Sequence, residues 1–161
     1  MVEIMEFRKL VDFLNYVVVA YNEALENIGL DSELINSQMA RAFKEKASEI
    51  IKDDFQLNIT GNDPKSIISS FMQRIKETGI CQKSEIVAMD DNNLTIKTGD
   101  SILNQADKIF LRDKPKNYVP PSPIISMLSA FLEEGTGKTC QILEYEFIPE
   151  ENSSKFTIKL V

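Results

Sequence analysis

Histidine is absent from this chain of 161 residues. Histidine is the commonest general base near neutral pH and the commonest imidazole metal ligand, so its absence excludes several kinds of site. Ser-His-Asp and Cys-His catalytic arrangements cannot form, and the chain cannot hold a haem through an axial histidine. The sequence therefore favours a function without catalysis.

Cysteine is scarce, with Cys81 and Cys140 far apart and outside any C-x-x-C spacing. A structural zinc site needs about four protein ligands, which two cysteines without histidine cannot supply. A disulfide framework is not expected either, and this cysteine usage fits a reducing compartment. We expect no metal and no cofactor, and we expect both cysteines to pack as small apolar side chains.

Long apolar runs are also missing. The most apolar run, residues 17–20, is far too short to span a bilayer. The N-terminal segment MVEIMEFRKL carries acidic residues at once and shows no signal-peptide pattern. We therefore expect a cytoplasmic protein without a membrane span.

The chain has fewer basic than acidic residues, which gives it a formal net charge of −7. Binding to nucleic-acid phosphates needs clustered positive charge, so we expect no nucleic-acid partner. One local exception consists of Lys108, Arg112, Lys114 and Lys116. Two interpretations of this cluster stay open: a solvated basic loop, or a site for a small anion or an acidic partner.

Hydrophobic residues make up 43% of the chain and charged residues 27%, which is ordinary for a globular protein of one domain. The strongest periodic segment is residues 4–28. Its apolar residues step by three or four: Ile4, Phe7, Leu10, Val11, Leu14, Val17, Val18, Tyr21, Leu25 and Ile28. Phe13, Tyr16 and Val19 lie off this face. A helix that is apolar on most sides is expected to be buried on most sides, which predicts a homodimer through this helix.

The rest of the chain alternates between helical and strand periodicity. Helices are predicted from Asp31 or Ser32 to about residue 52, from Pro64 to about residue 78, over residues 101–110 and from Pro123 to about residue 134. Strands are predicted over 83–89, 94–98, 139–147 and 155–161. Because hairpins need no crossover, the order ααα-ββ-αα-ββ predicts an α+β fold. One antiparallel sheet of about four or more strands would carry the helices on one face. The single domain 1–161 would comprise N-terminal helices (1–60) and a helix-hairpin-helix-hairpin core (61–161).

Two motifs invite a chemical interpretation. GTGKT at 135–139 resembles the end of a phosphate-binding loop, but Leu132 stands where that motif needs glycine. The segment also follows a helix and opens a strand, so we expect a plain helix-to-strand turn. Glu144 and Glu146 lie on one face of a predicted strand, as an acid/base pair would. Nothing nearby suggests a sugar-binding cleft, which favours a solvated strand face.

Aromatic and methionine side chains gather on the helices that should face the sheet. They either form plain core or line an apolar pocket. We predict that six residues contact an apolar small molecule: Phe71, Met72, Cys81, Phe110, Met127 and Phe131. Cys81 stands at the junction of a helix and the first strand, where it is either a packed thiol or an acylation site.

Residues 101–160 follow a recognisable order: a short helix, a Pro-containing loop, then SPIISMLSAFLEEGTGK, CQILEYEF and SSKFTIKL. This order resembles the C-terminal half of the 4-vinyl reductase domain family. In that family a helix leads into a strand ending in an acidic-then-Cys segment, and a Cys-x-Phe strand closes the hairpin. Here Glu144 stands at the acidic place, Glu146 near the first Cys place, and residues 154–156 at the closing segment. Both family cysteines are missing.

The resemblance implies a fold shared with haem nitric oxide sensors and vesicle-tethering complex subunits. In these folds helices cover an antiparallel sheet, an apolar pocket lies between them, and the N-terminal helices often dimerise. The missing cysteines count against the family's metal site, and the missing histidine excludes the sensor-type haem.

The function implied is a regulatory or accessory domain that holds an apolar small molecule between helices and sheet. Two alternatives stay open. One is a dimerising interaction or scaffold module without a ligand. The other is an enzyme-associated domain of tetrapyrrole or aromatic metabolism.

Overall fold

The computed structural model describes residues 2–47, 59–115 and 118–161. Its helices are α1 (Val2–Asn27), α2 (Ser32–Ala42), a π-helical turn (Phe43–Ala47), α4 (Pro64–Glu77), α5 (Asn104–Phe110), α6 (Pro123–Thr136) and short 3-10 turns (Leu111–Asp113 and Pro149–Glu151). Its strands are β1 (Cys81–Met89), β2 (Asn93–Ser101), β3 (Cys140–Ile148) and β4 (Ser153–Leu160). The predicted order of elements is confirmed. The end of the second predicted helix lies outside the described residues.

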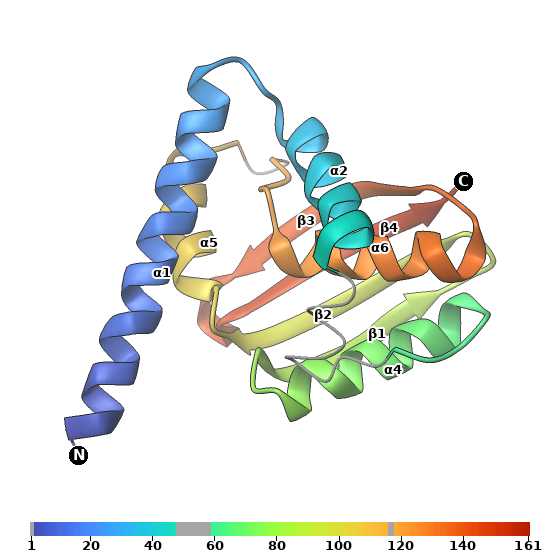
Figure 1. The fold of residues 1–161 in the computed structure, drawn as a ribbon, viewed down its shortest axis with the longest axis horizontal. Helices are drawn as coiled ribbons and strands as arrows, with labels where there is room; N and C mark the ends of the chain where they lie inside the picture. The colour runs from blue at the N-terminus through green and yellow to red at the C-terminus, as the bar shows by residue number, and fades with distance from the viewer. Residues whose placement is uncertain (1, 48–58, 116–117) are drawn as a thin grey trace.

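The strands form one antiparallel sheet in the order β1-β2-β4-β3, and α4 and α6 lie across one face of it (Figure 1). Alternate side chains of the two central strands point towards these helices. Leu94 and Ile96 on β2, and Phe156 and Ile158 on β4, are almost completely buried. This alternation is what a sheet with one covered face requires. The predicted α+β fold is confirmed.

The opposite face of the sheet is polar. Glu85, Lys97, Lys155 and Glu146 lie in register across β1, β2, β4 and β3. Each edge-strand glutamate therefore stands opposite a central-strand lysine, as favourable cross-strand pairs do. Glu146, from the suggested carboxylate pair, belongs to this row and is exposed. The pair fits a solvated strand face.

Helices α4 and α6 begin at the residues that the sequence indicated. The Asp63 carboxylate accepts a hydrogen bond from the Ser66 amide at 3.1 Å, directly before α4. The Ser122 hydroxyl accepts one from the Ile125 amide at 3.4 Å, before α6. These are side-chain caps that satisfy free amides of a first turn. Helix α6 ends at Thr136, and Gly137, whose φ of 69° favours glycine, caps it. Residues 137–139 of GTGKT therefore form the helix-to-strand turn, while Gly135 and Thr136 still belong to the helix.

Helix α1 lies at one end of the sheet, along α5, and only one side of it meets the rest of the chain (Figure 1). The side that is buried carries Asn15, Val19 and Asn22. By contrast, Phe13 is 62% exposed and Tyr16 is 59% exposed. The expectation that α1 is buried on most sides is therefore wrong for this chain by itself. Val19, which we placed on the surplus face, packs against α5.

Two buried asparagines attach α1 and α2 to the rest of the fold. In α1, the Asn15 side chain donates to the Ile102 carbonyl and accepts from the Ala106 amide, both at 2.7 Å. In α2, the Asn36 amide nitrogen donates to the Pro120 carbonyl at 3.1 Å. Its oxygen accepts from the Ser122 amide at 2.8 Å. Each asparagine thus satisfies backbone groups at the start of a later element.

A polar cluster attaches α5 to the sheet. The Tyr145 hydroxyl on β3 donates to the Asp107 carboxylate at 2.6 Å, and the Ser154 hydroxyl on β4 lies 3.3 Å from the same oxygen. Part of Asp107 reaches solvent, but its carboxylate points inward to these two hydroxyls. Burial raises the pKa of this carboxyl to about 6, although both hydrogen bonds lower it. Asp107 in the folded chain therefore keeps its proton up to a higher pH than an ordinary aspartate does.

Replacing Asn36 by alanine should lower the free energy of unfolding by about 1–3 kcal/mol, because buried backbone groups lose their partner. Urea unfolding followed by circular dichroism measures the change. Gln38→Ala is the matched control, since Gln38 is an exposed amide on the same helix. Equal losses in the two variants would show that the Asn36 hydrogen bonds contribute nothing specific.

Asp107 should make stability depend on pH. Its pKa in the folded chain, about 6, lies above the value of about 3.9 expected in the unfolded chain. As the pH rises, the unfolded chain loses this proton first. The free energy of unfolding should therefore fall by about 3 kcal/mol between about pH 4 and pH 6.

In the variant Asp107→Asn, the free energy of unfolding should not show this fall with rising pH. The amide oxygen still accepts a hydrogen bond from Tyr145, and the side chain has no proton to lose in this pH range. Asp113→Asn, at an exposed neighbouring carboxylate, serves as the control. Urea unfolding at several pH values across the window compares the slopes. Parallel slopes for wild type and Asp107→Asn would contradict the prediction.

Candidate functional site

The structure buries all six residues that we predicted to contact a ligand. Five of them pack in the main core between α4, α6 and the sheet: Phe71, Met72, Cys81, Met127 and Phe131. The rings of Phe71 and Phe131 contact each other with centroids 6.1 Å apart. Phe110 belongs to a second cluster with Val19 and Ala106. Five of the six predicted residues therefore lie together in the structure, and their contact with a ligand stays a prediction.

Cys81 is fully buried, with 0% of its surface exposed. Burial raises the pKa of its thiol to about 11. The thiolate is the reactive form of cysteine, so a protonated and enclosed thiol is a poor nucleophile. This environment favours the packed thiol over the acylation site.

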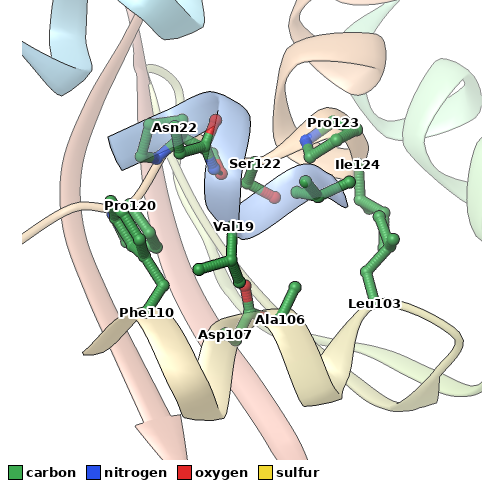
Figure 2. A pocket seen from close by; sticks show the side chains of 12 residues that line it. Val19, Asn22, Leu103, Ala106, Asp107, Phe110, Pro120, Ser122, Pro123 and Ile124 are labelled. Atoms are coloured by element: carbon green, nitrogen blue, oxygen red, sulfur yellow. Dashed lines mark hydrogen bonds between the residues drawn. The ribbon is translucent and has the colours of Figure 1, made fainter. Parts of the chain in front are cut away.

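A small cavity lies where α1, α5 and the start of α6 meet (Figure 2). Val19, Ala106, Phe110 and Ser122 face it, and Asp107 lies at its edge. The cavity volume is about 10 Å³. This volume admits about one water molecule and excludes an organic ligand. A hollow of about 140 Å³ lies beside Phe131 and Gly135.

A much larger groove runs between α2, the end of α6 and the start of the edge strand β3. Its volume is about 800 Å³, within the range of small-molecule sites. The residues lining it are Ser32, Glu33, Asn36, Ser37, Gln38, Ala40, Arg41, Pro115, Tyr118, Val119, Ser129, Glu133, Thr139, Cys140, Gln141, Ile142 and Val161. This groove is the candidate functional site.

The groove lining includes five apolar residues outside the helices, which we call the apolar strip: Tyr118, Val119, Cys140, Ile142 and Val161. These residues come from the loop before α6, from β3 and from the C-terminal end of the chain. Polar side chains of α2 and α6 border the strip. A molecule with an apolar body and a polar group matches such a lining.

Some of the polar groups that border the groove, Arg41 and Glu133 among them, are engaged in structural contacts. Arg41 forms an ion pair with Glu45 at 2.7 Å. The Glu133 carboxylate accepts a hydrogen bond from the Cys140 amide at 3.1 Å. Burial, and then the neighbouring Glu133 charge, raise the pKa of the Cys140 thiol to about 12. A thiol that stays protonated is not a nucleophile, so this arrangement suits binding and not covalent chemistry.

One wall of the groove is held by Glu26 at the end of α1. Its two carboxylate oxygens accept hydrogen bonds from the Tyr118 hydroxyl and from the Lys114 ammonium group. The ammonium group also lies 4.8 Å from the ring centroid of Phe110 and 5.1 Å from that of Tyr118. Burial, together with the Glu26 carboxylate, raises the pKa of Tyr118. The tyrosine is therefore a neutral hydrogen-bond donor, and it belongs to the groove lining.

The basic cluster that the sequence suggested is divided by these contacts. Lys114 is paired with Glu26, and Arg112 lies 3.3 Å from Asp113. Lys116 lies outside the described residues. Lys114 is therefore part of the packing of the domain, whereas Arg112 is a solvated side chain, so the two do not form one charged patch. Among the described side chains of residues 7–45, 59–115 and 118–161, no three His, Cys, Asp or Glu residues gather as a metal site would require. Within the same residues, no helix has the length and apolarity needed to cross a membrane.

The sequence did not identify the groove. Its lining comes from α2, the loop before α6, the end of α6 and β3, and no single pattern links these segments. The nearest signal was a pair of apolar residues, Tyr118 and Val119, within a loop that is otherwise charged and rich in proline. Apolar residues in such a loop indicate burial against another part of the chain.

No protein-family model matches this chain, and no curated protein matches it in sequence. Solved structures do resemble it. The phenol-responsive sensory domain of the transcription activator PoxR, crystallised with phenol, has a TM-score of 0.58 at 11% identity. The match covers 91% of this chain and 73% of that chain.

Two further structures resemble the chain. A trafficking protein particle complex subunit 3 from Naegleria fowleri, covalently bound to palmitic acid, has a TM-score of 0.57 at 16% identity. That match covers 94% of this chain and 95% of that chain. An Fe(II) unliganded H-NOX protein from K. algicida has a TM-score of 0.45 at 16% identity, over 85% of this chain and 67% of that chain. At such identities the first two likenesses establish the fold, which is the α+β arrangement that the sequence predicted.

Proposed function

We propose that this chain is a ligand-binding domain that holds an apolar small molecule in the groove between α2, α6 and β3. The observation that carries the proposal is the groove itself, with about 800 Å³ of volume and an apolar strip along one wall. A cavity of this size, mostly preformed and lined by apolar groups with polar ones at its border, is typical of small-molecule sites.

The two structures with the higher TM-scores support the same class of ligand. One contains phenol and the other contains palmitic acid. Both molecules combine an apolar body with a single polar group. The strip around Tyr118 and Val119 would receive the apolar body. Polar side chains of α2, such as Gln38, would face the polar group.

The chemistry of the groove favours binding without reaction. The Cys140 thiol is kept protonated by its burial and by Glu133. The chain contains no histidine that could serve as a general base. A domain that binds and does not transform its ligand fits a regulatory or accessory role. The enzyme-associated alternative gains no support from these residues.

The packed core is a rival location for the ligand. Phe71, Met72, Met127 and Phe131 lie under α4 and α6, and a ligand there would have to displace side chains that now contact each other. A second candidate function is an interaction module that dimerises without a ligand. The exposed apolar side chains of α1, among them Phe13 and Tyr16, favour it.

A thermal-shift titration with phenol and with palmitic acid tests the groove. A ligand present at about 100 times its Kd stabilises the folded chain by about 2.7 kcal/mol and should raise Tm by several degrees. Val119→Asp should abolish this shift, because it places a charge on the apolar strip. Val87→Asp makes the same change on β1, at the other edge of the sheet, and should leave the shift intact.

Phe71→Ala separates the groove from the core. This variant should lower the free energy of unfolding by about 3–5 kcal/mol, because it opens a cavity. The shift caused by ligand should remain. A shift that disappears in Phe71→Ala and persists in Val119→Asp would move the ligand into the core. No shift with either compound in the wild type would favour the interaction module.

A further inference from the structure

The polar face of the sheet carries a hollow of its own, next to the edge strand β1. Its volume is about 570 Å³. Lys83, Gly99 and Ser153 stand in register across β1, β2 and β4, and all three line the hollow. A Cβ atom at Gly99 would lie 3.4 Å from Lys83 Cβ and 3.5 Å from Ser153 Cβ. Because Gly99 has no side chain, space is left between its two neighbours. We call this site the polar hollow.

The hydroxyl of Ser153 is buried in the floor of the polar hollow without a partner. Only 3% of the residue is exposed. Its Oγ atom has no hydrogen bond to any of the described residues. Leaving a buried hydroxyl unpaired costs folding free energy, so such groups are rare in native proteins and need an explanation. A ligand that hydrogen-bonds to Ser153 supplies one.

The backbone beside this floor is held in an uncommon conformation. Asp100 follows Gly99, and Asn152 precedes Ser153. Both have positive φ, 50° and 47°. The Asp100 amide donates to the Asn152 carbonyl at 3.0 Å, and the Asn152 side chain donates to the Asp100 carboxylate at 3.0 Å. Uncommon backbone conformations gather at functional sites, where the surrounding contacts fix them. Here the contacts hold Gly99 and Ser153 side by side.

Two lysines border the floor, and each is paired with a carboxylate. The Lys83 ammonium group lies 2.7 Å from Asp100 Oδ2. The Lys97 ammonium group pairs with Glu151, which stands in the turn between β3 and β4. The Glu151 side chain is 54% exposed. Exposed ion pairs add little to stability, because water screens them. The pair of Lys97 and Glu151 can therefore open at small cost.

We propose that the polar hollow binds a free amino acid as its zwitterion, between Lys97 and Glu151. The ligand carboxylate accepts hydrogen bonds from the Lys97 ammonium group and the Ser153 hydroxyl. The ligand ammonium group donates to the Glu151 carboxylate. Every charge then keeps an opposite partner, and Ser153 gains the acceptor that it lacks. A simple anion would leave Glu151 unpaired beside the exposed Glu150, which also lines the hollow. The volume lies within the range of small-molecule sites.

Isothermal titration calorimetry of the full chain with each common protein amino acid tests the proposal. At least one amino acid should bind, with a single molecule per chain. Its amide lacks the carboxylate, and its N-acetyl form lacks the ammonium group. Each should bind at least about 10-fold more weakly, because each loses a charge-assisted hydrogen bond. A chain that binds no amino acid, or binds the N-acetyl form equally well, overturns the proposal.

Ser153→Ala separates a ligand contact from a structural role. The variant should bind the amino acid about 5- to 10-fold more weakly, because the carboxylate loses a donor. Without ligand it should be at least as stable as the wild type in urea unfolding, because the unpaired hydroxyl is gone. A structural serine would give the opposite result, with lower stability and unchanged affinity. Unchanged affinity in Ser153→Ala rules out the proposed site.

The charged pair is tested in the same titration. Lys97→Met should weaken binding at least about 10-fold. Lys159→Met, on the same face of β4 and outside the hollow, should leave the affinity unaltered. Glu151→Gln should lower the preference for the amino acid over its N-acetyl form about 10-fold, because the ammonium group loses its partner. A preference that stays the same contradicts the pairing. None of these residues lines the groove, so the two proposals fail separately.

Discussion

Apolar packing of α4 and α6 on one face of the sheet is the interaction on which the rest of the structure depends. It joins α4 to α6 so closely that a Cβ atom at Gly135 would lie 2.4 Å from Ile67 Cδ1. The same packing fills the space between helices and sheet with side chains such as Phe71 and Leu128. Room for a ligand therefore arises beside the core, where α2 packs against α6 and leaves the edge strand β3 partly uncovered.

Much of this fold could be predicted because its signals are local. The alternation of Phe156, Ile158 and Leu160 indicated a strand with one covered face, and all three are buried. Asp63 and Ser122 indicated helix starts through their capping side chains. The orientation of α1 could not be predicted, because periodicity reveals apolar faces and does not reveal which of them the same chain covers.

The candidate site was harder to predict for two physical reasons. A buried aromatic such as Phe131 has the same sequence pattern whether it fills a core or lines a pocket, since the pattern contains no information about volume. The groove depends on tertiary packing between distant segments: Ala40 on α2 and Ile142 on β3 are about a hundred positions apart. The buried Asn36 helps to hold α2 against the start of α6 through its hydrogen bonds to Pro120 and Ser122.

The carboxylate of Glu26 has a consequence for communication across the molecule. It belongs to α1, and it accepts a hydrogen bond from the hydroxyl of Tyr118, a residue that lines the groove. A ligand that moved Tyr118 would disturb its hydrogen bond to Glu26 at the end of α1. A displacement of α1 would, through the same hydrogen bond, disturb Tyr118 in the groove lining. If ligand binding changed the affinity of self-association by some factor, self-association would change the affinity for the ligand by the same factor. One half-buried carboxylate thus joins the end of α1 to the lining of the groove.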